Sequence, residues 1–176
     1  PRYDLVNDIQ SLGMHRFWKR TMAAMADPKP DDSALDVCCG TGDMVRRLSE
    51  SGASVTGVDF SSAMLEKALI ANAGLRVTGP FLVRGDALKL PFENQRFDIV
   101  TISYGLRNLT DLRLGLDEMR RVLKPNGRLL ILDFGKPDCT LWRWIYYLYL
   151  RFSVPLLGRL FCGDLLAYAY ILRSLK

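Results

Sequence analysis

The chain has 176 residues, with 24 basic and 19 acidic side chains and a formal net charge of +5. Apolar residues make up 49% and charged residues 24%, which excludes a disordered tail, a linker or a fibrous protein. The length predicts one domain. The four cysteines have no CxxC spacing and there is one histidine, so we expect no metal site and no disulfide framework. A reducing cytosol fits this pattern.

The last 38 residues differ in composition from the rest. Residues 139–176 carry a net charge of +4 and nine of the 18 aromatic side chains. Arginines at positions 143, 151 and 159 interrupt the apolar run, and so does Pro155. We interpret the segment as peripheral to a membrane rather than spanning it, and we do not expect it to bind nucleic acid.

The chain begins with a helical pattern, which the two prolines in residues 27–32 end. Strand and helix patterns then alternate. The predicted strands are 34–38, 54–59, 81–84, 97–103 and 128–133, and the predicted helices are 43–50, 62–72 and 111–123. This order predicts a doubly wound, mainly parallel α/β sheet with helices on both faces. Ligands of such folds bind at the carboxyl ends of the strands.

The first predicted strand ends in a glycine turn, DVCCGTGD. Gly40 and Gly42 let the backbone approach a ligand closely, and Asp59 ends the second strand, where a carboxylate can accept hydrogen bonds from a ribose. An adenosine-containing ligand is therefore expected. A dinucleotide fold would have a third glycine at position 45, which is Val here.

Carboxylates near the turn favour S-adenosyl-L-methionine over a dinucleotide. Asp36 can hold the α-ammonium group of this cofactor, directly or through water. Unlike a dinucleotide, the cofactor has no pyrophosphate that the carboxylate would repel. After the third strand, Asp86 can accept from the adenine amino group while the N–H of Ala87 donates to the ring. We predict a methyltransferase with S-adenosyl-L-methionine as cofactor.

Five segments carry a resemblance to a known family: YDLVNDIQSLGMHRFWKR (3–20), DVCCGTGD (36–43), GVDFSSAML (57–65), LPFENQRFDIVTISYGLRNL (90–109) and EMRRVLKPNGRLLILDF (118–134). The glycine turn and LKPNGR are widely shared among class I methyltransferases, whereas YDLVN, LGMHRFWK and YGLRN are specific. On these motifs the chain resembles the ubiquinone/menaquinone biosynthesis C-methyltransferase family, whose members are demethylmenaquinone methyltransferase-like.

The resemblance implies a Rossmann-like class I methyltransferase domain over residues 1–176. Its parts would be an N-terminal helical cap (1–26), a cofactor-binding α/β core (33–138) and an aromatic, basic, helical lid over the substrate (139–176). The family's sheet is finished by an antiparallel strand pair, which we expect to be missing from this chain. The edge of the fifth strand would then be uncovered.

The resemblance also implies the site residues. The cofactor contacts fall on Thr41, Asp59, Asp86, Ala87 and Ser103, in addition to Asp36, Gly40 and Gly42. The catalytic, ring-facing residues are Arg107 and Asn108, and Tyr3, Asn7 and Tyr104 complete the substrate site. For Arg107 the alternative is a pair with a carboxylate at the surface.

The expected reaction is methylation of a ring carbon of a prenylated quinol, either demethylmenaquinol or a ubiquinol precursor. Arg107 would stabilise the oxyanion or polarise a water that takes the proton, and Asn108 would fix the second ring oxygen. Alternative acceptors are a phytyl-naphthoquinol, a sterol or a fatty acyl chain, and a non-enzymatic alternative is a membrane-associated lipid binder. We expect a cytoplasmic protein, peripheral on the inner membrane face, and consider a homodimer.

Overall fold

A computed structural model describes residues 11, 13–73, 81–133, 135, 139, 140, 144 and 148. The chain divides into two compact units, one formed by Lys19–Asp133 and the other by Pro1–Trp18 with Phe134–Lys176. The first unit holds the whole of the described sheet. The division of the chain into cap, core and lid remains a prediction.

Five parallel strands form the sheet, in the order β3-β2-β1-β4-β5. The strands are β1 (Ser33–Val37), β2 (Ser54–Asp59), β3 (Phe81–Arg84), β4 (Phe97–Ser103) and β5 (Leu123–Leu132). The strand order reverses between β1 and β4, because the chain runs outward from β1 to β3 and then returns to the other side of β1. This point is where open α/β sheets bind ligands.

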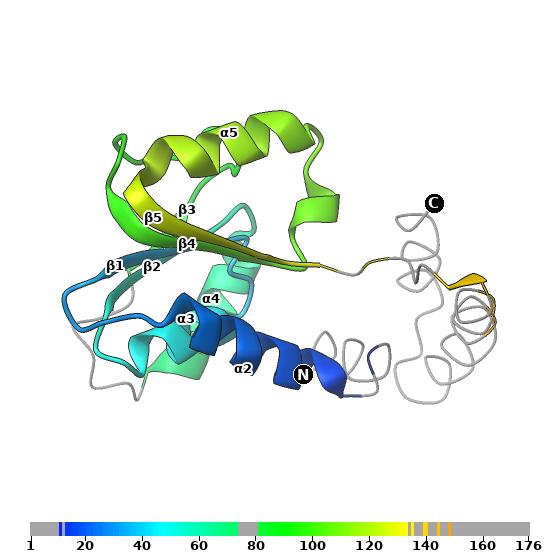
Figure 1. Cartoon of the computed structure of the whole chain (residues 1–176). Helices are drawn as coiled ribbons and strands as arrows, with labels where there is room; N and C mark the ends of the chain where they lie inside the picture. The colour runs from blue at the N-terminus through cyan, green and yellow to red at the C-terminus, as the bar shows by residue number, and fades with distance from the viewer. Residues whose placement is uncertain are drawn as a thin grey trace. The chain divides into compact units, whose positions relative to one another are not determined.

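Helices cover both faces of the sheet (Figure 1). α3 (Asp43–Ser49) and α4 (Ser62–Asn72) lie on one face, and α5 (Leu112–Val122) lies on the other. α2 (Met14–Ala26) precedes β1, and a short 3-10 helix, η1 (Leu106–Asn108), follows β4. The predicted doubly wound α/β fold is therefore confirmed.

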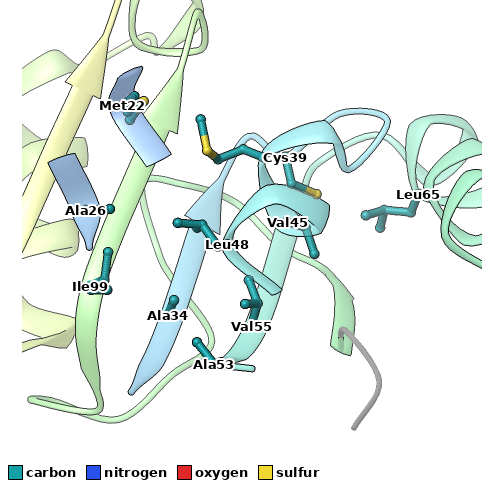
Figure 2. Close-up of a cluster of buried hydrophobic side chains, with 11 residues drawn as sticks. Met22, Ala26, Ala34, Cys39, Val45, Leu48, Ala53, Val55, Leu65 and Ile99 are labelled. Atoms are coloured by element: carbon teal, nitrogen blue, oxygen red, sulfur yellow. The ribbon is translucent and has the colours of Figure 1, made fainter. Parts of the chain in front are cut away.

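Among the described residues, the core consists of two apolar clusters, one that includes α3 and one that includes α5. Val45 and Leu48 of α3 belong to the cluster of Val55 and Ile99 from the sheet (Figure 2). On the α5 side, Met119 is fully buried with a second set of strand residues. Because the central strands are covered on both faces, every residue of β1 after Ser33 is buried, as expected of a parallel sheet.

The fifth strand begins five residues earlier than the sequence predicts. Leu123 already pairs with Phe97, and regular pairing with β4 resumes only at Arg128, opposite Ile99. The intervening KPNG segment, residues 124–127, includes Asn126 in the left-handed region, at φ 63°. The turn residues that predict a break between helix and strand thus form an irregularity inside β5. Among the described strands, β5 pairs with β4 alone and lies at one edge.

Candidate active site

The turn after β1 has an unusual backbone at three alternate positions. Cys38, Gly40 and Gly42 all have positive φ angles, of 56°, 55° and 78°. A Cβ atom on Gly40 would meet no heavy atom within 4 Å, so this position faces open space. A Cβ atom on Gly42 would lie 2.7 Å from Nδ2 of the buried Asn72, so no larger residue fits there without a shift.

Asp59 ends β2 and joins two loops through its carboxylate. Oδ2 accepts a hydrogen bond from the backbone N–H of Gly40 at 2.8 Å, and Oδ1 accepts one from the N–H of Ser61 at 2.9 Å. Each carboxylate oxygen has a further lone pair, so these bonds orient the group and still leave acceptor capacity for a ligand hydroxyl. The sequence placed Asp59 at this edge but gave no indication of its bond to the glycine turn.

A pocket of about 470 Å³ opens at the carboxyl ends of the strands, within the range of small-molecule sites. It brings together three predicted cofactor residues, Asp59, Asp86 and Ala87, with the predicted ring-facing Asn108. The other lining residues are Cys38, Val58, Phe60, Gly85, Leu88, Leu109 and Thr110. One apolar wall and two carboxylates fit an adenosine group.

Asp86 is exposed, and its own turn orients it. Oδ1 accepts from the N–H of Leu88 at 2.9 Å, and the backbone N–H of Gly85 donates to the carbonyl oxygen of Asp59 at 3.1 Å. The loop after β3 is therefore hydrogen-bonded to the end of β2, and the carboxylates of Asp59 and Asp86 line the same pocket. This arrangement fits a ligand with both a ribose diol and a base amino group.

Asp36 lies beneath this edge rather than on the pocket wall. Its side chain is buried between β1 and β4, where Oδ1 accepts a hydrogen bond from Oγ1 of Thr101 at 2.7 Å. Burial raises the pKa of Asp36 to about 7, against the lowering effects of the Thr101 hydrogen bond and of the positive charge of Lys19. Asp36 can therefore change its ionisation near neutral pH.

Lys19 of α2 forms an ion pair with Asp43 at the start of α3, with Nζ 3.2 Å from Oδ2. Asp43 also pairs with Arg46 and Arg47. Burial alone would raise the pKa of Asp43, but Lys19 and Arg47 outweigh it and the pKa is lowered. The last residue of the DVCCGTGD motif thus has a structural role that motif reading did not assign.

The turn after β4 packs directly against the turn after β1. A Cβ atom on Gly105 would lie only 2.6 Å from Cβ of Cys38. The adjacent Tyr104 is buried and has a positive φ of 58°, and burial raises the pKa of its hydroxyl group. Ser103, which precedes it, donates to Sδ of Met22 at 3.4 Å. The predicted cofactor loop and the predicted substrate loop are in contact.

Arg107 forms an ion pair with Asp133, the residue that follows β5. Nη1 lies 2.6 Å from Oδ1, and the backbone N–H of Arg107 donates to Oδ2 at 3.2 Å. The sequence left open a pair of Arg107 with a carboxylate at the surface; the structure has such a pair, although both side chains are only 16% exposed. The guanidinium carbon also lies 5.9 Å from the centroid of the Tyr104 ring.

The thiol of Cys38 lies on the pocket, but its environment opposes reactivity. Burial raises its pKa to about 12, and the negative charges of Asp59, Asp36 and Asp86 add to this effect. A thiol with such a pKa is protonated at neutral pH and is a poor nucleophile.

Two predicted residues lie outside the described part of the chain, and two contacts of predicted residues were missed by the sequence. Tyr3 and Asn7 lie outside the described residues. Thr41 is half-buried in the turn after β1 but is not a lining residue of the pocket. Thr101 and Asp133 were missed as partners of Asp36 and Arg107. The sequence could have indicated Asp133, because this acid ends a predicted strand in the same way as Asp59.

The described part of the chain holds neither a cluster of metal ligands nor a helix that could span a bilayer. No group of three or more histidine, cysteine or acidic residues there could hold a metal ion. None of the helices described has both the length and the apolar character needed to cross a bilayer.

Comparison with known proteins agrees with the geometry. The sequence profile of the ubiE/COQ5 methyltransferase family matches residues 1–176. A 2-phytyl-1,4-naphtoquinone methyltransferase of Trichormus variabilis is 45% identical over 99% of this chain and 78% of its own length. A demethylmenaquinone methyltransferase of Staphylococcus epidermidis is 40% identical over 98% of this chain and 72% of its own length.

Solved structures share the fold over a smaller part of their length. The YcgJ protein of Bacillus subtilis has a TM-score of 0.64 and 29% identity, covering 76% of this chain and 58% of that chain. A putative methyltransferase of Bacillus halodurans has a TM-score of 0.66 and 25% identity, covering 77% of this chain and 60% of its own. The profile, the relatives and the strand-end pocket agree: the chain belongs to the ubiE/COQ5 methyltransferase family, whose cofactor is S-adenosyl-L-methionine.

Proposed function

We propose that this protein methylates a ring carbon of a prenylated naphthoquinol, with demethylmenaquinol as the first substrate to test. The observation that carries the proposal is the family match over residues 1–176, which includes the YGLRN motif. The names of both relatives described above refer to a naphthoquinone or a menaquinone. A phytyl-naphthoquinol is the second candidate because the relative at 45% identity carries that name.

The residues at the strand ends suit the cofactor. Asp59 would accept from the ribose hydroxyl groups, while Asp86 and Ala87 would bind the adenine. Gly40 leaves room for the methionine part of the cofactor, and Asp36 would balance its ammonium charge. S-adenosyl-L-methionine, when bound, supplies an electrophilic methyl group, so the protein mainly aligns the acceptor and excludes water.

The substrate must be activated by loss of a proton. A ring carbon of a quinol is a poor nucleophile until the neighbouring hydroxyl group is deprotonated and the phenolate donates electron density to the ring. Arg107 would stabilise this oxyanion, and Asn108 would bind the second ring oxygen. The proton from the methylated ring carbon then leaves, which restores the aromatic ring.

A product assay tests the proposal. The chain is incubated with methyl-labelled cofactor and, separately, with reduced demethylmenaquinone, a reduced phytyl-naphthoquinone and a reduced ubiquinone precursor. We expect a methylated naphthoquinol, identified by its mass, and no product from the oxidised quinones, because they lack the hydroxyl group. Methylation of a sterol or fatty acyl chain, or of no quinol, would contradict the proposal.

We further propose that residues 139–176 contact the membrane surface and cover the acceptor. A polyprenylated quinol partitions into lipid, so its tail can remain in the bilayer while the protein holds the ring. The basic charge and the Trp and Tyr residues of this segment suit an anionic lipid interface.

A further inference from the structure

The turn that carries Arg107 is attached to the end of β5 at two consecutive residues. The backbone N–H of Tyr104 donates to the carbonyl oxygen of Leu132 at 2.7 Å, and the backbone N–H of Arg107 donates to Asp133 at 3.2 Å. Asp133 also accepts from the guanidinium group of the same arginine. One carboxylate therefore fixes both the main chain of η1 and the side chain that it presents.

We propose that Asp133 is a positioning residue for Arg107, an inference that rests on the function proposed above. Its carboxylate holds the guanidinium group through Nη1 at the carboxyl ends of β4 and β5, so that Arg107 meets the oxyanion without first having to be ordered. The bond of 2.6 Å and the 16% exposure of both side chains mean that water competes weakly with this contact. The Tyr104 ring lies 5.9 Å from the guanidinium carbon and limits its movement further.

A second role for the same carboxylate predicts the opposite result. If Asp133 only neutralised Arg107, its removal would strengthen the positive field at the oxyanion and turnover would rise or stay constant. If Asp133 positions Arg107, its removal leaves the positive charge of Arg107 in place but allows the guanidinium group to move. A misplacement of about 1 Å can cost roughly a hundredfold in rate. The direction of the change in turnover therefore separates the two roles.

Asp133→Asn tests the proposal, with Asp133→Glu as the conservative variant. We expect Asp133→Asn to lower kcat by about tenfold to a hundredfold with little change in KM or in affinity for S-adenosylhomocysteine. Asp133→Glu should restore part of the loss. In the Arg107→Ala background, Asp133→Asn should have a much smaller effect, because the guanidinium group is gone and only the backbone contact to residue 107 remains.

Glu118→Gln is the matched control. Glu118 is also 16% exposed and also accepts from an arginine, Arg121, and from a backbone N–H, that of Leu90, but it lies on α5 outside the residues assigned to the site. It should leave kcat unchanged. Three results would overturn the proposal. They are unchanged turnover in Asp133→Asn, an equal loss of turnover in Glu118→Gln, and a full additional loss when Asp133→Asn is added to Arg107→Ala.

Nitrogen-15 NMR of the arginine side chains gives a readout that needs no substrate. Rotation of the Arg107 guanidinium group should be slow in the parent and fast in Asp133→Asn. This signal separates the two proposals: a parent that methylates no quinol but has a restrained Arg107 contradicts only the proposed function. Unrestrained rotation of Arg107 in the parent would overturn the role of Asp133.

Discussion

The carboxylate of Asp59 accepts a hydrogen bond from the backbone N–H of Gly40 at 2.8 Å, so the acid that we propose to bind the ribose also holds the glycine turn. Asp59→Ala should therefore weaken cofactor binding in two ways, by losing the diol contact and by releasing the turn. We expect a loss of about 1.5 to 3 kcal/mol in affinity for S-adenosylhomocysteine, measured by calorimetry.

The exposed Glu66→Ala on α4 is the control for Asp59→Ala, because it also removes one carboxylate from the same unit. Its affinity for S-adenosylhomocysteine should equal that of the parent. Parental affinity in Asp59→Ala would refute the ribose assignment.

Arg107→Ala should lower turnover by two or more orders of magnitude, the usual effect of removing one oxyanion donor. Affinity for the cofactor should remain intact, since Arg107 is not a lining residue of the pocket that contains Asp59 and Asp86. Single-turnover kinetics and calorimetry measure the two effects separately. A parallel loss of cofactor binding would instead give Arg107 a structural role.

Cofactor binding should depend on pH through Asp36, whose pKa lies near 7. The folded-state pKa is raised above the usual 3.8, so the folded protein retains this proton between about pH 4 and 7 and loses it as the pH rises through 7. An ammonium group prefers the ionised form. Affinity should therefore fall by up to about tenfold per pH unit below 7.

Calorimetry in two buffers of different ionisation enthalpy measures the proton that binding displaces from Asp36. We expect release of nearly one proton per cofactor at pH 6, almost none at pH 8.5, and none at either pH in Asp36→Asn. That variant keeps an acceptor for Thr101 but cannot titrate. No release from the parent at pH 6 would argue against Asp36 as the group that balances the ammonium charge.

Asp98, at the opposite end of the sheet, should contribute to acid stability. Its Oδ2 accepts from Nζ of Lys124 at 2.8 Å and from the N–H and hydroxyl groups of Ser33. Burial opposes ionisation, but these contacts outweigh it and lower the pKa to about 2. The stabilisation is present above about pH 4 and is lost as the pH falls towards 2.

Asp98→Asn should therefore destabilise the fold at pH 7 by about 1 to 2 kcal/mol after allowance for solvent screening, and by less at pH 3. Urea unfolding at both pH values measures the difference. Asp31→Asn, at an exposed position, is the control and should have no effect. An equal loss at both pH values would mean that the ion pair is not the cause.

The aromatic, basic segment should bind anionic liposomes at low salt and release them at high salt. Replacing Arg143, Arg151 and Arg159 together by Gln should weaken co-sedimentation and lower turnover on long-tailed quinols. The control replaces three exposed cations of the core unit, Lys67, Arg113 and Arg120, and so changes the net charge equally. No binding by the parent, or equal loss in both variants, would contradict a specific membrane contact.

Much of the fold follows from local sequence. The predicted bounds of β2, β3 and β4 coincide with those observed, because each apolar run ends at a polar or glycine-rich loop. The start of β5 could not be predicted in this way. Its first residue pairs with Phe97 across an irregularity, and that pairing depends on the neighbouring strand rather than on the local sequence.

The pocket could be predicted only in part, for the same reason. Asp59 and Asp86 lie at strand ends, and parallel strands bring such ends to one edge whatever their order. The Asp36–Thr101 contact requires β1 beside β4 in one register, and the Arg107–Asp133 contact requires β4 beside β5. Which strands lie side by side is decided only when the sheet assembles, so these two contacts could not be predicted from the local sequence.

The contact between Gly105 and Cys38 links the two halves of the reaction. Since a single methyl group at position 105 would lie 2.6 Å from Cβ of Cys38, neither turn can gain volume without displacing the other. A bulkier side chain at position 38 would push the turn that carries Arg107 away from β1 and change the reach of the guanidinium group. Residue size at positions 38 and 105 therefore sets how closely the turn after β4 can approach the turn after β1, and with it the position of Arg107.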